Sequence, residues 1–251
     1  MLGVAQGCAE VVPVSSSAQL VLLPWLLGWE HSSEHATFAA ALHAGSCLGI
    51  GWVLREDVMS LDLRTAALLA GTCVPPAVAG YLVADRVEER LRRPAHLAAV
   101  LAGAGALLWA VDRRAEGRRR HPAVGVRHAA LAACAQIPAL APGVSRSGAT
   151  LTALRAAGID RAPAERFSLL MSLPVTAGAA VLTLARTDRT TLRALGPSLG
   201  AGAVSAALAG AAAAGALRRR PGRPATGPAL YRLALAAAVA RRIRTTGKDR
   251  W

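Results

Sequence analysis

Long apolar runs dominate the hydrophobic pattern of this chain. Runs without any Asp, Glu, Lys or Arg cover residues 65–84, 95–111, 167–185 and 194–217. A membrane-spanning helix needs about 20 apolar residues, whereas a helix on a soluble protein carries a polar stripe at a period of about 3.6 residues. These runs have the length and lack the stripe. We therefore predict an all-α polytopic membrane protein rather than a soluble helical protein.

The runs form two groups, and each group follows a segment that prolines interrupt. Pro13 interrupts residues 2–27, and Pro138 and Pro142 interrupt residues 129–157. Proline disrupts a helix, and at membrane depth a broken helix occurs only where protein or a water-filled cavity surrounds it. We predict a re-entrant helix pair at each segment. The spans are expected at about 38–54, 66–84 and 96–111 in the first repeat (1–128), and at 167–185, 194–217 and 228–240 in the second (129–251).

A shift of 130 residues aligns the two broken segments. Ala5, Gln6, Ala9, Val14, Ser15 and Ser17 then fall on Ala135, Gln136, Ala139, Val144, Ser145 and Ser147. Because each repeat crosses the membrane an odd number of times, the second repeat would be inverted relative to the first, as in many membrane transporters. We expect the two re-entrant pairs to enter from opposite faces and to meet near the midplane.

The broken segments also carry the polar side chains that suggest chemistry. Gln6 and Glu10 are four residues apart, so they share a helix face. Residues 15–17 are all serine and follow a proline, as a helix N-terminus that offers free N–H groups to anions does; Ser145-Arg146-Ser147 matches them in the second repeat. Arginine is costly inside a membrane unless it meets an anion, and its guanidinium binds phosphate through paired hydrogen bonds. We predict a phosphate-handling site.

Simpler interpretations stay open at this point. Glu10 and Arg146 could form a structural ion pair between the repeats, and the serines could be ordinary interhelical hydrogen bonders. Other phosphatase types fit less well, because the chain has no GxxxxGK[ST] phosphate loop, no GxSxG elbow and no histidine after His128.

The net charge of +14 does not change this picture. The basic clusters at 113–120, 218–220 and 241–244 flank apolar runs, as segments that touch anionic lipid do, and they lack interleaved aromatics, so we expect no nucleic-acid partner. We expect the 113–120 loop on the cytoplasmic side. The cysteines form no CxxC pair. The N-terminus has no basic stretch, so we expect no cleavable signal peptide.

The pairing of xQGxxExxPxSSSxxL with PGVSRSGAT resembles the BacA-type undecaprenyl-diphosphate phosphatases. The resemblance implies hydrolysis of an isoprenyl diphosphate lipid, undecaprenyl diphosphate, to undecaprenyl phosphate and inorganic phosphate at the outer face of the bacterial plasma membrane. That reaction recycles the cell-wall carrier lipid, and overproduction gives bacitracin resistance. The resemblance further implies a divalent cation (Mg²⁺ or Ca²⁺). We expect membrane lipids as neighbours and leave a homodimer open.

Position by position, the resemblance assigns catalytic roles to Glu10, to Ser16 as nucleophile (with water as the alternative) and to Arg146. The expected phosphate ligands are Ser15, Ser17, Gln19, Ser145, Ser147 and Thr150.

Two positions depart from the pattern. Gln6, a metal ligand together with Glu10 in this interpretation, stands where many members have glutamate, and Gln19 stands where most have histidine. An amide cannot act as a general acid or base. Glu10 alone could activate the nucleophile, or His43 could be an auxiliary base. The chain could also be a weakly active lipid-binding paralogue, and a prenyl-phosphate flippase or transporter is the alternative function.

Overall fold

The computed structural model of this chain describes residues 1–29, 34–91, 93–116, 123–247 and 249, without the side chains of 83–91. Regular structure in these ranges is helical. The elements are α1 (Leu2–Val11), α2 (Ser16–Leu27), α3 (His35–Val53), α4 (Arg55–Met59), α5 (Leu63–Gly71), α6 (Val74–Leu91), α7 (Pro94–Arg114), α8 (Val126–Ala135), the 3-10 turn η1 (Pro138–Leu140), α9 (Arg146–Ala156), α10 (Arg161–Arg186), α11 (Arg189–Arg219) and α12 (Thr226–Thr246). The loop expected to be cytoplasmic lies partly outside the described residues, at 117–122.

Among the described residues, 5 stretches of helix are long and apolar enough to cross a membrane. They are His35–Val53, Leu63–Leu82, Pro94–Arg114, Arg161–Arg186 and Arg189–Arg219. The prediction of an all-helical polytopic membrane protein is therefore confirmed, and the chain is an integral membrane protein. The segment expected as a last span, 228–240, lies within α12, which is 21 residues long but is not among these 5 stretches.

Prolines divide some of the expected elements and leave others continuous. The first broken segment separates at Pro13, because α1 ends at Val11 and α2 begins at Ser16. The run expected as one span at 66–84 is divided between α5 and α6, where Pro75 and Pro76 occupy the first turn of α6, the position at which a missing N–H costs least. Proline also lies inside α10 and α11 without ending either helix.

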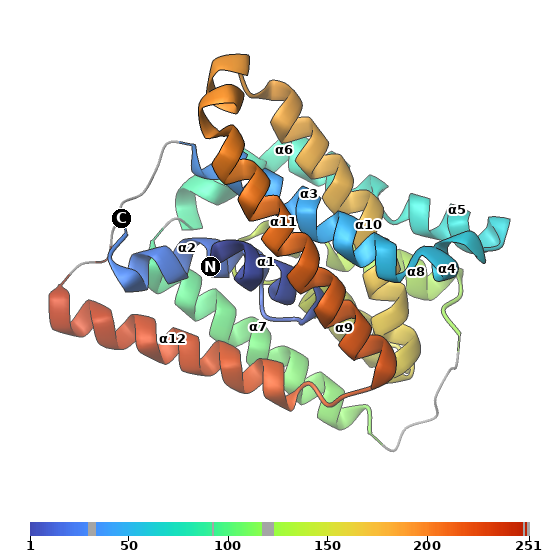
Figure 1. Cartoon of the computed structure of the whole chain (residues 1–251). Helices are drawn as coiled ribbons and strands as arrows, with labels where there is room; N and C mark the ends of the chain where they lie inside the picture. The colour runs from blue at the N-terminus through green and yellow to red at the C-terminus, as the bar shows by residue number, and fades with distance from the viewer. Residues whose placement is uncertain (30–33, 92, 117–122, 248, 250–251) are drawn as a thin grey trace.

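The helix α11 crosses the front of the molecule in Figure 1 and packs closely against α1 and α3. Small residues allow this close approach. A Cβ added at Gly7 of α1 would lie 2.3 Å from the carbonyl oxygen of Ala206, and one at Gly49 of α3 would lie 2.0 Å from that of Ala207. The contact with α11 therefore holds α1 in place, with Glu10 near its C-terminal end.

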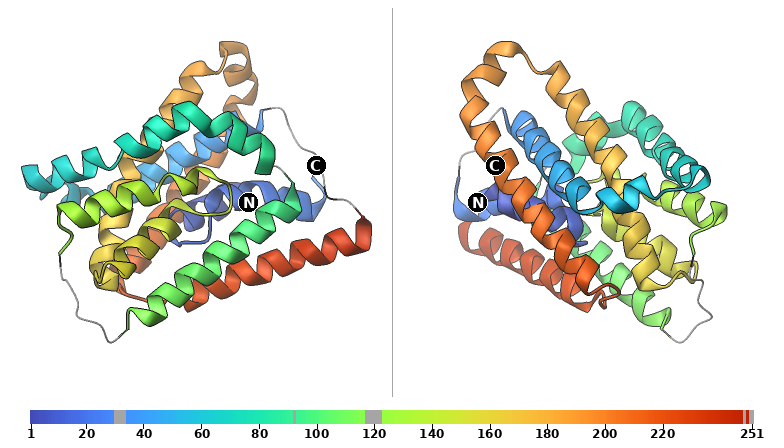
Figure 2. Two further views of the ribbon diagram at one scale, coloured as in Figure 1. Left: turned by 180° about the vertical axis from the view of Figure 1, so that it is seen from behind. Right: turned by 45° about the vertical axis from the view of Figure 1, so that its right-hand side comes forward.

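Two helical hairpins meet in the interior. One is α1–α2, and the other is α8–α9, seen from behind in Figure 2. The helix α12 lies along α7, and its Arg232 donates a hydrogen bond to the connecting segment of each hairpin. The helix α9 also packs against α7 and α10. The first residues of α2 and α9, Ser16 and Arg146, both contact Glu10 near the end of α1.

Candidate functional site

Glu10, which is 6% exposed, is at the centre of a buried polar cluster. Its Oε2 atom accepts hydrogen bonds from Nε2 of Gln6 (2.9 Å) and from Oγ of Ser16 (3.1 Å). Its Oε1 atom accepts from Nη2 of Arg146 (3.0 Å) and from Oγ1 of Thr176 (3.2 Å). A buried carboxylate requires this kind of compensation. The predicted convergence of Glu10 and Arg146 is thus present in the structure.

Arg146 is the first residue of α9, and it is held from two directions. Nη2 pairs with Glu10, while Nη1 donates to the carbonyl oxygen of Ser168 in α10 at 3.0 Å. A guanidinium has five N–H donors, and these two bonds leave others unused. Arg146 can therefore bind an anion without releasing its protein partners.

The two serine-rich turns share an uncommon backbone conformation. Ser15 has φ of 69° and Ser145 has φ of 73°, and these are the non-glycine residues with positive φ in the described part of the chain. Left-handed conformations are strained for such residues and cluster at functional sites. In each turn the serine hydroxyl also contacts the hydroxyl two residues later, Ser17 at 3.3 Å and Ser147 at 3.2 Å. The same geometry thus recurs 130 residues apart, at positions that the sequence shift aligns.

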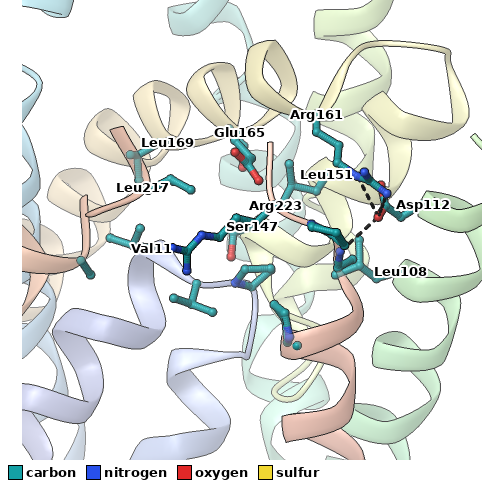
Figure 3. Close-up of a pocket in the computed structure, with 18 of the residues that line it drawn as sticks. Val11, Leu108, Asp112, Ser147, Leu151, Arg161, Glu165, Leu169, Leu217 and Arg223 are labelled. Atoms are coloured by element: carbon teal, nitrogen blue, oxygen red, sulfur yellow. Dashed lines mark hydrogen bonds and ion pairs between the residues drawn. The ribbon is translucent and has the colours of Figure 1, made fainter. Parts of the chain in front are cut away.

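A cavity of about 520 Å³ opens beside this cluster, within the size range of small-molecule sites. Glu10, Arg146 and Ser147 line one part of it. Figure 3 shows Val11 and Ser147 on one side of the cavity and Asp112 and Arg161 on the other. Apolar residues of α7, α9, α10 and α11 complete the wall. The cavity therefore has charged side chains on both of these sides as well as apolar walls, which suits an amphiphilic anion.

Two of the predicted phosphate ligands, Thr150 and Ser145, do not line the cavity. The Thr150 side chain is fully buried, and its hydroxyl bonds to Oγ of Ser168 at 2.7 Å and to backbone carbonyls of its own helix. Ser145 caps α9 by accepting from the backbone N–H of Gly148 at 3.2 Å. In this arrangement both residues shape the start of α9, and the cavity wall is formed by their neighbours Arg146 and Ser147.

Gln19 is held away from Glu10. Its Nε2 donates to the carbonyl oxygen of Val14 at 3.2 Å, and its Oε1 accepts from the hydroxyl of Tyr231 at 2.7 Å. His43 is closer to Glu10, with Nε2 3.8 Å from Oε2 of that carboxylate. Nδ1 of His43 lies 2.7 Å from the carbonyl oxygen of Ala39 and therefore carries the proton of that bond. The second ring nitrogen faces the carboxylate.

The expected metal ligands give a mixed donor set. In the described residues no group of three His, Cys, Asp or Glu side chains could hold a metal ion. Oε1 of Gln6 is a buried oxygen without a hydrogen-bond donor, and Nε2 of the same amide donates to the Glu10 carboxylate. Mg²⁺ is often held by one or two protein oxygens together with substrate phosphates. The residues present therefore fit a cation that arrives with a phosphate, and they do not form a metal cage by themselves.

Sequence reasoning missed the contribution of α10. Ser168 and Thr176 contact Arg146 and Glu10, respectively. Together with Ser172 they recur every four residues in an apolar run, and this spacing places them on one helix face. That stripe of hydroxyls was the available signal.

A second ion-pair network at the far side of the cavity was also missed. Asp112, 3% exposed, accepts from Nε of Arg155 (2.8 Å) and from Nη2 of Arg161 (2.8 Å), and Arg161 also contacts Glu116. The backbone N–H of Ala225 donates to the same carboxylate at 3.1 Å. Asp112 therefore ties α7, α9, α10 and the segment before α12 together.

Comparison with known proteins gives consistent matches. The family described as "Bacitracin resistance protein BacA" matches residues 1–238. The chain is 39% identical over 201 residues to an undecaprenyl-diphosphatase of Gemmatimonas aurantiaca, covering 73% of this chain and 74% of that protein. It is 40% identical over 228 residues to an undecaprenyl-diphosphatase of Pelobacter propionicus, covering 84% and 83%. A protein of the same name from Geobacter metallireducens is 40% identical over 198 residues, covering 72% and 73%.

Proposed function

Because the chain belongs to the BacA family, we propose that it is an undecaprenyl-diphosphatase of the bacterial plasma membrane. It hydrolyses undecaprenyl diphosphate to undecaprenyl phosphate and inorganic phosphate, and so recycles the carrier lipid and contributes to bacitracin resistance. The observation that carries this proposal beyond family membership is the convergence of Arg146, Glu10 and Ser16 beside a cavity with apolar walls.

Arg146 binds the terminal phosphate in this proposal. Its unused N–H donors and the hydroxyl of Ser147 border the cavity, while Glu10 and Ser168 hold the guanidinium in place. A guanidinium fixed before the substrate arrives stabilises the charge that develops on the transferred phosphoryl oxygens without reorganising.

Ser16 is the proposed nucleophile, and Glu10 is its base. The Ser16 hydroxyl, which already donates to Oε2 of Glu10 at 3.1 Å, transfers its proton there as Oγ attacks the terminal phosphorus. The bond from that phosphorus to the bridging oxygen breaks, and undecaprenyl phosphate leaves with the bond's electrons. Water then attacks the phosphoserine, the bond from phosphorus to Oγ breaks, and Oγ takes its proton back from Glu10. Inorganic phosphate leaves with the protons of the water. Gln19 cannot exchange a proton with Glu10, because it is an amide held by Val14 and Tyr231. His43, whose Nε2 faces Glu10, takes this role.

A divalent cation, Mg²⁺ or Ca²⁺, is part of the proposal. Oε1 of Gln6 and the Glu10 carboxylate are the residues that would hold it. The cation would neutralise charge on the substrate's phosphates.

The proposal is tested by phosphate release from purified protein supplied with undecaprenyl diphosphate, with and without a chelator. Arg146→Ala should abolish release. Arg166→Ala is the matched control, because Arg166 also pairs with a carboxylate, Asp57, but lies at an exposed site outside the cavity. Unchanged release from the Arg146 variant would reject the assigned phosphate-binding role.

The alternatives give different results in the same experiment. A flippase or transporter would move prenyl phosphates across vesicle membranes without releasing phosphate. A weakly active paralogue would release phosphate slowly and gain a large rate increase from Gln19→His.

We also propose that the two hairpins are the re-entrant elements of inverted repeats. The matching backbone at Ser15 and Ser145 supports this arrangement. In a variant without its own four cysteines, single cysteines introduced at Leu27 and Ala157, which the 130-residue shift aligns at the ends of α2 and α9, should react with a membrane-impermeant reagent from opposite sides. A homodimer stays a proposal, and the mass of the purified protein in detergent tests it.

A further inference from the structure

Arg232 of α12 is a fully buried arginine, with an exposed fraction of 0%. Nε donates to the carbonyl oxygen of Pro13 at 2.7 Å, and Nη1 donates to that of Val144 at 3.3 Å. Nη2 has no hydrogen-bond partner. Within the described residues, Arg232 forms no ion pair with a carboxylate.

Its two acceptors belong to the two hairpins. Pro13 lies in the segment between α1 and α2, and Val144 lies in the segment that leads into α9. Both precede the strained serines, Ser15 and Ser145, by one or two residues. Arg232 is thus a single side chain that joins both loops of the site by hydrogen bonds.

Glycines make the space for this side chain. A Cβ at Gly105 of α7 would lie 2.9 Å from Cδ of Arg232, and one at Gly148 of α9 would lie 2.5 Å from Nη2. Burying an arginine without a carboxylate is unfavourable, so filling this space with an apolar side chain would be the more stable solution. A role beyond packing is therefore needed to account for it.

We propose that Arg232 is a positioning residue for the phosphatase site. By holding Pro13 and Val144 together it sets the distance between Ser16 on one hairpin and Arg146 on the other. The nucleophile and the phosphate-binding guanidinium come from different hairpins, so their separation depends on this connection. This inference rests on the proposed function for its kinetic consequence, but not for its structural one.

The structural consequence is tested by a double-mutant cycle on the thermal unfolding midpoint. Gly148→Ala should lower the midpoint of the wild-type protein, because the new Cβ meets Nη2 of Arg232. In an Arg232→Met background the same change should lower the midpoint by less, because only the Cβ of Ser145 at 3.3 Å remains close and alanine is the better helix former. Equal effects of Gly148→Ala in both backgrounds would overturn the placement of the Arg232 guanidinium against Gly148 of α9. This arm needs no enzymatic activity.

The kinetic consequence is tested with phosphate release. A misplacement of about 1 Å can cost about 100-fold in rate, so Arg232→Met should lower kcat by about that factor. KM should change by less than about 3-fold, because Arg146 and Ser147 remain in place. Arg242→Met is the matched control: Arg242 lies on the same helix and donates to the carbonyl oxygen of Leu26 at 2.6 Å, far from both loops. Its kcat should stay at the wild-type value.

Arg232→Lys serves where the methionine variant does not fold. A lysine ammonium carries its three donors on one nitrogen and cannot occupy the positions of Nε and Nη1 at the same time, so this variant should fold and still lose kcat with KM retained. A wild-type kcat for Arg232→Lys or Arg232→Met would overturn the positioning role. If the wild-type protein itself releases no phosphate, the proposed function fails, while the double-mutant cycle still decides whether Arg232 makes the contact.

Discussion

Replacing Glu10 by glutamine separates the catalytic role of this residue from its structural role. The carboxylate accepts hydrogen bonds from Gln6, Ser16, Arg146 and Thr176. A glutamine keeps the shape and one acceptor oxygen, but it presents an N–H₂ group where the second oxygen was. If the retained oxygen stays on the Arg146 side, the new donor faces Gln6 and Ser16.

Gln6 can accommodate this change. Its Oε1 atom is buried without a partner, so a flip of the amide would let that oxygen accept from the new N–H₂ group. The net structural loss is then about one hydrogen bond to a charged group, and we expect a cost of about 1–3 kcal/mol in the free energy of unfolding. Both changes remove the anion opposite Arg146, but Glu10→Ala should be worse, at about 3–5 kcal/mol, because it also leaves Arg146, Ser16 and Thr176 without an acceptor oxygen.

The effect of Glu10→Gln on activity should be far larger than its effect on stability. An amide cannot take the Ser16 proton, and general-base catalysis contributes about 10²–10⁴-fold. We expect kcat to fall about 1000-fold, equivalent to about 4 kcal/mol in the activation barrier.

The measurement is phosphate release at saturating undecaprenyl diphosphate, with thermal unfolding followed on the same preparation. Glu56→Gln, at an exposed ion pair with Arg218, is the matched control and should keep its activity. A folded Glu10→Gln protein with a kcat within about tenfold of wild type would refute Glu10 as the base.

Further predictions concern single side chains. His43→Gln should lower kcat for phosphate release, and an unchanged kcat would remove His43 from the proton relay. Asp112→Asn should lower the free energy of unfolding by about 3 kcal/mol, measured in detergent, because it weakens a buried pair with two arginines. Hydrogen bonds from the Thr190 hydroxyl and the Thr191 backbone hold the pKa of Asp188 below its usual range. The stabilisation they give is therefore present at neutral pH and is lost as the pH falls through that lowered pKa, so Asp188→Ala should lower the unfolding temperature at pH 7 but not in strong acid.

Much of the site was accessible from the sequence because its signals are local. Charge-free runs of about 20 residues predict helices of membrane length through composition alone. The serine triplets after prolines mark helix starts through local backbone preferences, and both start where expected, at Ser16 and Arg146. The four-residue spacing of Gln6 and Glu10 places them on one face, and the structure joins them by a hydrogen bond.

Only the tertiary structure decided which residues from distant segments contact the site residues. Sequence spacing says nothing about which apolar helix faces the site, so the support that α10 gives through Ser168 and Thr176 was not predicted. The same holds for Gln19, because its amide oxygen accepts a hydrogen bond from the hydroxyl of Tyr231, which is 212 residues away in the sequence.

Arg232 shows the physical reason most clearly. From the sequence it is one charge inside the expected span at 228–240. In the structure its guanidinium reaches two carbonyls on hairpins that the chain places far apart, through space left by glycines of two other helices. Local sequence determines helices and their ends, because backbone preferences and hydropathy act over a few residues. The close packing of small residues brings those ends together, and that depends on the shapes of several helices at once.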